Sequence, residues 1–149
     1  MKHFLAISFA ALLAQMNAHA RVGETREEIA TRYGEGKKMP TQRLAGTESF
    51  EYSKSGFIVE VVIVDGKSVM EIYARNEGTS DEAIKELLKV NTPVGTAWRF
   101  DKKAGRWERS GVPRLVGYRW PGHPDFFCIK DLKACEAAEK KNKPNAEGL

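Results

Sequence analysis

The sequence has few of the side chains that bind zinc or form nucleophile and base pairs. Its 149 residues include two cysteines and three histidines. A structural zinc site usually takes four Cys or His ligands. Beyond the N-terminal segment, which contains the other two histidines, the chain offers only three such residues, Cys128, Cys135 and His123. A catalytic triad would depend on His123, which lies in the turn-rich segment 120–125, where we expect an exposed loop residue rather than a base. We therefore predict no metal site, no cofactor and no enzyme activity.

The chain also lacks a strong excess of one charge and a long apolar run. It has 24 basic and 20 acidic residues and a formal net charge of +4, which falls short of the clustered basic field of a dedicated nucleic-acid-binding domain. No apolar run reaches the roughly 20 residues that a transmembrane helix needs. We expect no nucleic-acid partner and no membrane-spanning segment. The length suits one domain with one core.

Residues 1–20 are typical of a secretory signal peptide. A basic start at Met1-Lys2-His3 precedes an apolar run over 4–14, and small residues follow at Ala18-His19-Ala20. Export machinery recognises this three-part arrangement. We predict cleavage after Ala20 and a protein that is periplasmic or secreted. No cysteine lies beside the cut, so we expect no lipid anchor.

The strongest structural signal is a central β-hairpin over residues 57–74. Two β-rich runs, 57–64 and 67–74, flank Asp65-Gly66, a favoured hairpin turn. With a two-residue loop, Glu60 and Glu71 lie directly opposite each other, where like charges destabilise the pair. A four-residue loop would relieve this, so the register stays open. In either case we expect one core face made of Phe57, Val59, Val61, Ile63, Met70, Ile72 and Ala74.

Helical signals occur before and after this hairpin. Thr25 and Glu28 match a capping box, a second helix is predicted after Ser80 from apolar residues at helical spacing, and Asp131 can cap a third helix that runs to Lys141. Short strands separated by Gly and Pro are expected over 96–120. We predict a single α+β domain over 21–141, with a mainly antiparallel sheet packed by short helices, and a flexible tail over 142–149.

Several of these segments carry a family resemblance. They are Val22-Gly23-Glu24-Thr25-Arg26-Glu27-Glu28-Ile29, Tyr33-Gly34, Asp65-Gly66 and Glu71-Ile72-Tyr73. This stretch, about residues 22–75, resembles small exported bacterial domains of the SmpA/OmlA type, the similar β-lactamase-inhibitor-protein fold, and uncharacterised exported proteins with a "GET…RYG" opening. The resemblance implies helices packed on a sheet and a non-catalytic protein-binding domain of the cell envelope. It carries over no functional residues.

Cys128 and Cys135 are the two cysteines of the chain. In an exported protein an oxidising compartment permits a disulfide between them. The alternative is a pair of small buried residues that never meet. A bridge over so short a loop would be structural and worth about 2 kcal/mol. Catalytic thiol chemistry is not expected, because the spacing is not that of a Cys-x-x-Cys pair.

Glu60 and Glu71 have a second interpretation besides a solvated sheet face. Two carboxylates placed opposite each other can tune each other's pKa for acid and base chemistry, or bind a hard cation. This pair underlies an alternative function, a small metal-free hydrolase or lyase that uses carboxylate and arginine residues. We favour the solvated face.

The segment 98–120 is the candidate binding surface. It carries seven basic residues, two acidic residues and five aromatic residues. Alternation along short strands would place rings in the core and cations in solvent. The sharper interpretation has exposed Trp and Arg binding an anionic envelope polymer or an acidic protein face, and the two interpretations are compatible. The candidate binding residues are Arg99, Arg106, Trp107, Arg109, Arg119 and Trp120.

The sequence as a whole therefore predicts an exported, non-catalytic binding or accessory module of the cell envelope or extracellular space. The predicted partner is a protein or an anionic envelope polymer.

Overall fold

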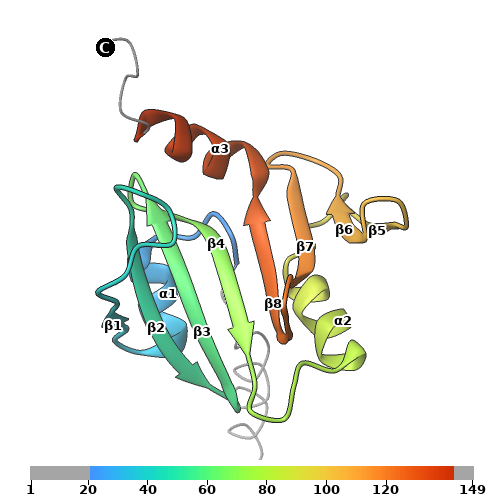
Figure 1. Cartoon of the computed structure of the whole chain (residues 1–149), viewed down its shortest axis with the longest axis horizontal. Coiled ribbons are helices and arrows are strands. Elements are labelled where there is room, and N and C mark those ends of the chain that lie inside the picture. Colours follow the sequence, from blue (N-terminus) through green and yellow to red (C-terminus); the bar gives the residue numbers. More distant parts are fainter. Residues whose placement is uncertain (1–20, 143–149) are drawn as a thin grey trace, which may run out of the picture.

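The computed structural model describes residues 21–142. The predicted signal peptide and residues 143–149 of the predicted tail lie outside the described residues. The described chain contains three helices and eight strands (Figure 1). In chain order they are α1 (Arg26–Tyr33), β1 (Lys37–Lys38), β2 (Glu48–Lys54), β3 (Phe57–Val64), β4 (Lys67–Ala74), α2 (Asp81–Val90), β5 (Trp98–Asp101), β6 (Arg106–Arg109), β7 (Leu115–Trp120), β8 (His123–Asp131) and α3 (Leu132–Lys141).

The eight strands form one antiparallel sheet in the order β1-β2-β3-β4-β8-β7-β6-β5. A helix followed by four strands occurs twice along the chain, and the last strands of the two halves, β4 and β8, pair at the centre of the sheet. This arrangement confirms the predicted α+β class with a mainly antiparallel sheet. No helix within residues 21–142 is long and apolar enough to cross a membrane.

Each helix begins at a residue whose side chain caps it. Thr25 accepts a hydrogen bond from the backbone N–H of Glu28, and the Glu28 carboxylate accepts one from the N–H of Thr25, which completes a capping box. Ser80 caps α2 and Asp131 caps α3 in the same way, each accepting from the N–H three residues on. The caps fix where the helices leave the strands.

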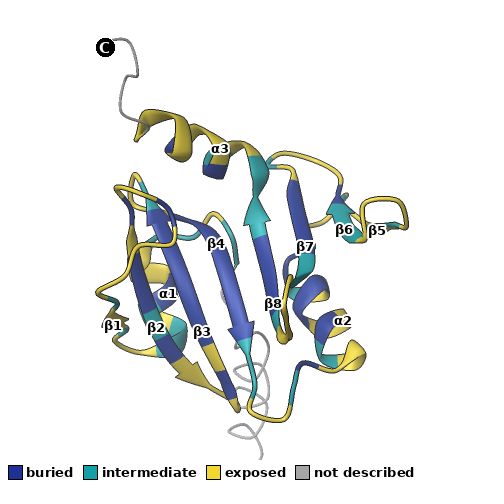
Figure 2. Ribbon diagram, viewed as in Figure 1, coloured by how far each residue is buried: buried dark blue, intermediate teal, exposed yellow. Residues whose placement is uncertain are grey.

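The sheet buries both of its faces, one more completely than the other. On one face α1 and α2 cover the main core, which includes Ile29, Val59, Ile84 and Phe127. On the other face α3 lies across one end of the sheet, with Cys135 and Ala138 buried beneath it. Figure 2 shows β3 and β4 buried along most of their length, whereas the loops around β5 are exposed. We call the two faces the α1/α2 face and the α3 face.

The facing predicted for the residues of β3 and β4 is wrong, because β4 contains a bulge. Val64 pairs with Lys67 across the two-residue turn, but Val62 pairs with Met70, so β4 has one extra residue at Val69. The bulge places Met70, Ile72 and Ala74 on the α3 face, opposite to the face of Phe57, Val59, Val61 and Ile63.

The same bulge separates the two glutamates. Glu60 pairs with Ile72, and Glu71 pairs with Val61. Because directly paired residues share a face and neighbours along a strand alternate, Glu60 points to the α3 face and Glu71 to the α1/α2 face. The predicted carboxylate pair is therefore not formed. The bulge removes the like-charge contact that a regular two-residue hairpin would impose.

Candidate functional site

The six candidate binding residues divide between the two faces of the sheet. Arg109 pairs with Trp98 and Trp107 with Phe100, so these side chains share the α1/α2 face. The remaining candidate on this face is Arg119, which bonds to the start of α2. Arg99, Arg106 and Trp120 lie on the α3 face. The sequence segment therefore does not form one continuous patch.

The three residues on the α1/α2 face are engaged in packing and bonding within the fold. The Trp107 ring contacts Phe127 edge-on, with centroids 5.7 Å apart. Arg119 donates from Nη1 to the carbonyl of Thr79 at 2.7 Å and from Nη2 to Asp81 Oδ1 at 2.8 Å. Trp107 therefore packs against the core, as the core interpretation of the segment predicts. Arg119 instead lies on the same face as the rings and ties the start of α2 to the sheet, whereas that interpretation placed the cations in solvent.

Arg109 is the most buried of the candidates, with 4 % of its surface exposed. Its Nη1 donates to the carbonyl of Asn91 at 2.7 Å, and its Nη2 donates to the carbonyl of Pro113 at 2.9 Å. Burial lowers the pKa of its guanidinium. The Nε atom has no hydrogen-bond partner among the described residues. Arg109 thus ties the C-terminal end of α2 to the loop that precedes β7.

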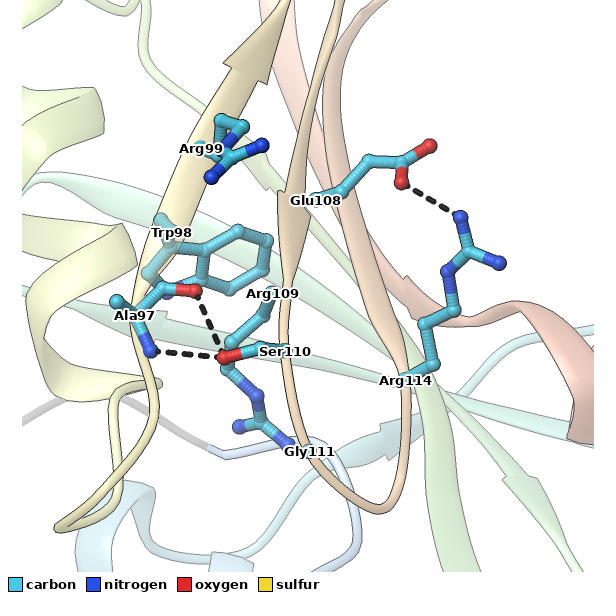
Figure 3. A pocket seen from close by; sticks show the side chains of 8 residues that line it. All are labelled: Ala97, Trp98, Arg99, Glu108, Arg109, Ser110, Gly111 and Arg114. Atoms are coloured by element: carbon cyan, nitrogen blue, oxygen red, sulfur yellow. Dashed lines mark hydrogen bonds and ion pairs between the residues drawn. The ribbon is translucent and has the colours of Figure 1, made fainter.

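A pocket of about 380 Å³ lies where β5 begins and β6 ends. We call it the basic pocket, and Figure 3 shows its lining. The lining residues are Ala97, Trp98, Arg99, Glu108, Arg109, Ser110, Gly111 and Arg114. Arg99 and Arg114 lie on either side of Glu108 (Figure 3), and Arg99 pairs directly with Glu108 across the strands. Two cationic side chains and one carboxylate therefore line the α3 side of the pocket.

Glu108 is the acidic centre of this cluster. Its Oε1 accepts from Arg106 Nη2 at 2.7 Å, and its Oε2 accepts from Arg114 Nη2 at 2.6 Å. These bonds, the one from Arg106 most of all, lower the pKa of Glu108. Asp101 pairs directly with Arg106 on the same face. Two carboxylates therefore lie among Arg99, Arg106 and Arg114, and the cluster keeps a small excess of positive charge. Arg99 is exposed to solvent.

Three exposed apolar side chains of the described part of the chain belong to the segments that flank the pocket residues. Among the described residues the exposed large hydrophobic side chains are Ile58, Val94, Phe100 and Val112, and Phe100 is 45 % exposed. Val94 precedes β5, Phe100 belongs to β5, and Val112 lies in the loop that contributes Gly111 to the pocket. Phe100 lies on the α1/α2 face and Arg99 on the α3 face, so β5 presents an exposed ring on one side and an exposed arginine on the other.

Trp120 lies apart from this cluster on the open part of the α3 face. Its ring stacks on Tyr118 at 6.2 Å, and the Arg43 guanidinium lies 5.7 Å from its centroid. Arg43 also donates from Nε to both oxygens of Glu60, at 3.0 and 2.9 Å. Glu60 therefore forms an ion pair with Arg43, and its direct cross-strand neighbour on β2 is Glu51 rather than Glu71.

Glu71 lies in a buried polar cluster beneath α1, with 0 % of its surface exposed. Tyr73 donates from its hydroxyl to Glu71 Oε2 at 2.5 Å, and Glu71 Oε1 has no hydrogen-bond partner among the described residues. Burial raises the pKa of Glu71 to about 8, although the Tyr73 bond opposes the shift. The ion-paired Glu24 and Arg32 also act on it. Near neutral pH the carboxyl is therefore mostly protonated.

Cys128 and Cys135 lie in the same buried cluster under α3, and neither is bonded to another cysteine in the structure. Burial raises the pKa of Cys128 to about 12 and that of Cys135 to about 11, and the Cys135 Sγ donates to the carbonyl of Val69 at 3.6 Å. These are features of inert, protonated thiols. A disulfide between them stays a prediction.

His123 is exposed and contacts the Phe126 ring edge-on, with centroids 5.6 Å apart.

Sequence reasoning missed Arg114 and Glu108 as site residues. Both belong to the segment 98–120, but only the strand register brings Arg99, Glu108 and Arg114 to one face and one pocket. The sequence analysis also missed the partners of Glu71. The bulge that turns Glu71 toward α1 cannot be recognised from the hydrophobic pattern. The spacing of Arg106 and Glu108, two residues apart on a predicted strand, was an available signal that these two side chains share a face.

Comparison of the chain with protein-family models, with curated proteins and with solved structures finds no match. The resemblance to exported envelope domains therefore stays a prediction, and the functional argument rests on the geometry of the chain itself.

Proposed function

We propose that this protein is an exported, non-catalytic binding module, and that its basic pocket takes an anionic group of its partner. The observation that carries the proposal is the placement of Arg99 and Arg114 on either side of Glu108 in a solvent-accessible pocket. Arg106, which pairs with Asp101, also bonds to Glu108 from outside the pocket lining. Arginine presents a planar, multidentate donor surface that suits carboxylate, sulfate and phosphate groups. The partner is an acidic protein face or an anionic envelope polymer.

The alternative function, a metal-free hydrolase or lyase, was based on a carboxylate pair formed by Glu60 and Glu71, and this pair does not form. Glu60 and Glu71 lie on opposite faces of the sheet and cannot act on one substrate. Glu71 is enclosed beneath α1, and Glu60 is held by Arg43. Within the described residues no other pair of carboxylates lines the basic pocket, whose only acidic residue is Glu108.

Export belongs to the same proposal and supports the choice of partner. A chain cleaved after Ala20 would meet envelope polymers and envelope proteins rather than nucleic acid. Sequencing the N-terminus of the protein recovered from the periplasm or the medium of a producing bacterium tests this directly. A protein that starts at Arg21 supports export, and an intact Met1 start in the cytoplasm contradicts it.

Binding is tested with purified protein and two soluble polyanions, polyglutamate and dextran sulfate. We expect binding that weakens steeply as salt rises, because exposed charges are screened. Arg99→Ala combined with Arg114→Ala should weaken it by about tenfold. The matched control is Lys133→Ala combined with Lys140→Ala, which removes the same charge from exposed positions on α3. If both double variants lose the same affinity, binding reflects net charge and the basic pocket is not the site.

A further inference from the structure

The two edges of the sheet differ in how they are protected. An edge strand exposes unpaired backbone groups, and proteins commonly blunt such edges with short strands, lysines and proline. The β1 edge has all three devices, since it is two residues long, consists of Lys37 and Lys38, and precedes Pro40. The β5 edge has four residues with no lysine or proline among them, although two lysines follow directly at positions 102 and 103, and it carries the half-exposed Phe100. The second edge is therefore open to another strand.

Strand register identifies which backbone groups face outward. The Ser110 N–H donates to the carbonyl of Ala97 at 3.1 Å, so Ala97 directs its backbone toward β6. In an antiparallel pair this direction alternates along the strand. Arg99 and Asp101 therefore also face β6, and Trp98 and Phe100 present their N–H and C=O groups at the outer edge. No other strand of the described chain pairs with this edge.

The side chains on the two sides of this edge differ in chemistry. Arg99 lies on the α3 face next to the Arg106, Glu108 and Arg114 cluster. Phe100 lies on the other face, where it packs against the Trp107 ring with centroids 4.7 Å apart. On the α3 face, β5 itself carries Arg99 and Asp101, and the Arg106, Glu108 and Arg114 cluster lies behind them. A strand added to β5 would place every second side chain on this face, and the intervening side chains beside exposed aromatic surface.

We propose that the outer edge of β5 binds an extended segment of an acidic partner protein as a ninth strand of the sheet. The segment alternates acidic and apolar residues, with the acidic side chains over Arg99 and the basic pocket and the apolar side chains over Phe100. Backbone hydrogen bonds to Trp98 and Phe100 supply affinity, and the alternating side chains supply specificity. This inference rests on the proposed function, because it names the partner of the same pocket.

Charge argues for a partner protein rather than a second copy of the chain. Pairing of β5 with β5 of another molecule would bring two copies of the arginine cluster to one side of a continuous sheet. The cluster holds Arg99, Arg106 and Arg114 against Glu108 and Asp101. Two lysines follow directly after β5, at positions 102 and 103, so two copies would bring together two surfaces of net positive charge. An acidic segment meets the same edge with opposite charge.

The test uses the purified protein and the peptide acetyl-Glu-Val-Glu-Val-Glu-Val-amide. Two derivatives carry N-methyl groups, one on the Glu amides and the other on the Val amides. They keep the charge and composition of the parent peptide, but only one of them blocks the amides that face β5. We expect that derivative to bind at least about tenfold more weakly than the parent, because it loses backbone hydrogen bonds. The other derivative should bind like the parent.

Two further measurements on the same samples locate the bound peptide. The amides of Trp98 and Phe100 should gain protection from hydrogen exchange when the parent peptide binds. Arg99→Ser should weaken binding several-fold, whereas Lys140→Ala on α3, the matched loss of one cation, should not. These results together would support strand addition at β5.

Other outcomes overturn the inference and show whether the basic pocket survives. If both methylated derivatives bind like the parent, binding is electrostatic and strand addition is wrong, while the anionic-ligand proposal stands. If polyglutamate binds and the parent peptide does not, strand addition is again wrong and the anionic-ligand proposal again stands. If neither binds, both proposals fail. If sedimentation shows a dimer whose Trp98 and Phe100 amides are already protected, a second copy occupies the edge and the inference is wrong.

Discussion

The two halves of the molecule repeat one order of elements but fill the space between helix and sheet with different chemistry. In the first half α1 buries a single residue, Ile29, four positions after its cap. In the second half α2 also has an isoleucine, Ile84, four positions after its cap, and it buries Leu87 and Leu88 as well. Three positions beyond each isoleucine stands Arg32 in one half and Leu87 in the other.

The central strands continue the contrast. The fifth and seventh residues of β4 are Glu71 and Tyr73, and those of β8 are Phe127 and Ile129. All four are buried on the α1/α2 face. The first half therefore buries a hydrogen-bonded carboxyl where the second half buries a phenylalanine. We infer that apolar burial fixes α2 firmly to the sheet that carries the binding edge, whereas the attachment of α1 depends on protonation.

The largest expected effect is the loss of the apolar anchor in the second half. Leu87 is fully buried in the main core, so Leu87→Ala should lower the free energy of unfolding by about 2–5 kcal/mol. Lys85→Ala on the same helix, at an exposed position, is the control and should change it by less than about 0.5 kcal/mol. Urea denaturation measures both. Equal losses would show that α2 is not anchored by its apolar face.

The next effect is a dependence of stability on pH that belongs to the first half. The pKa of Glu71 is raised from 4.5 to about 8 in the folded protein. Between these values the folded state binds more protons than the unfolded state, so stability falls as pH rises from about 4.5 to about 8. Glu71→Gln keeps a neutral side chain of similar shape and should remove most of this slope.

Urea denaturation of the unmodified protein and of Glu71→Gln between pH 4.5 and about pH 8 measures the free energy of unfolding and tests this prediction. At pH 9 the Glu71→Gln variant should be more stable than the unmodified protein, because only the latter must ionise a buried carboxyl. Leu87→Ala should shift the whole curve down and leave its slope unchanged. If the slope persists in Glu71→Gln, the buried carboxyl is not its source, and the contrast between the halves is one of packing alone.

Local signals in the sequence were sufficient for the fold class and for the helix starts. The capping box at Thr25 and Glu28, the cap at Asp131 and the helical spacing of Ile84, Leu87 and Leu88 are all present in the structure. Each depends on residues within one or two turns of the chain. Such short-range signals fix the elements before the sheet is assembled.

The site could not be predicted in the same way, because it depends on strand register. A single extra residue at Val69 reverses the facing of Glu71, and no change in the hydrophobic pattern marks it. The pairing of Arg99 with Glu108 joins parts of the chain separated by a turn. The sequence contains the arginines of the basic pocket, but only the register decides which of them share a face.

The smallest expected effect compares the two caps. Thr25→Ala and Ser80→Ala each remove one side-chain acceptor from a helix start, which costs about 1 kcal/mol. Because α1 buries one residue and α2 buries three, the loss should appear as local opening of α1 and leave α2 protected by its contacts with the sheet. Hydrogen exchange of the amides of α1 and α2 in the two variants measures whether each helix opens locally. If Ser80→Ala exposes the amides of α2 as strongly as Thr25→Ala exposes those of α1, apolar burial does not hold α2 more firmly, and the buried carboxyl of the first half is as good an anchor as the leucines of the second.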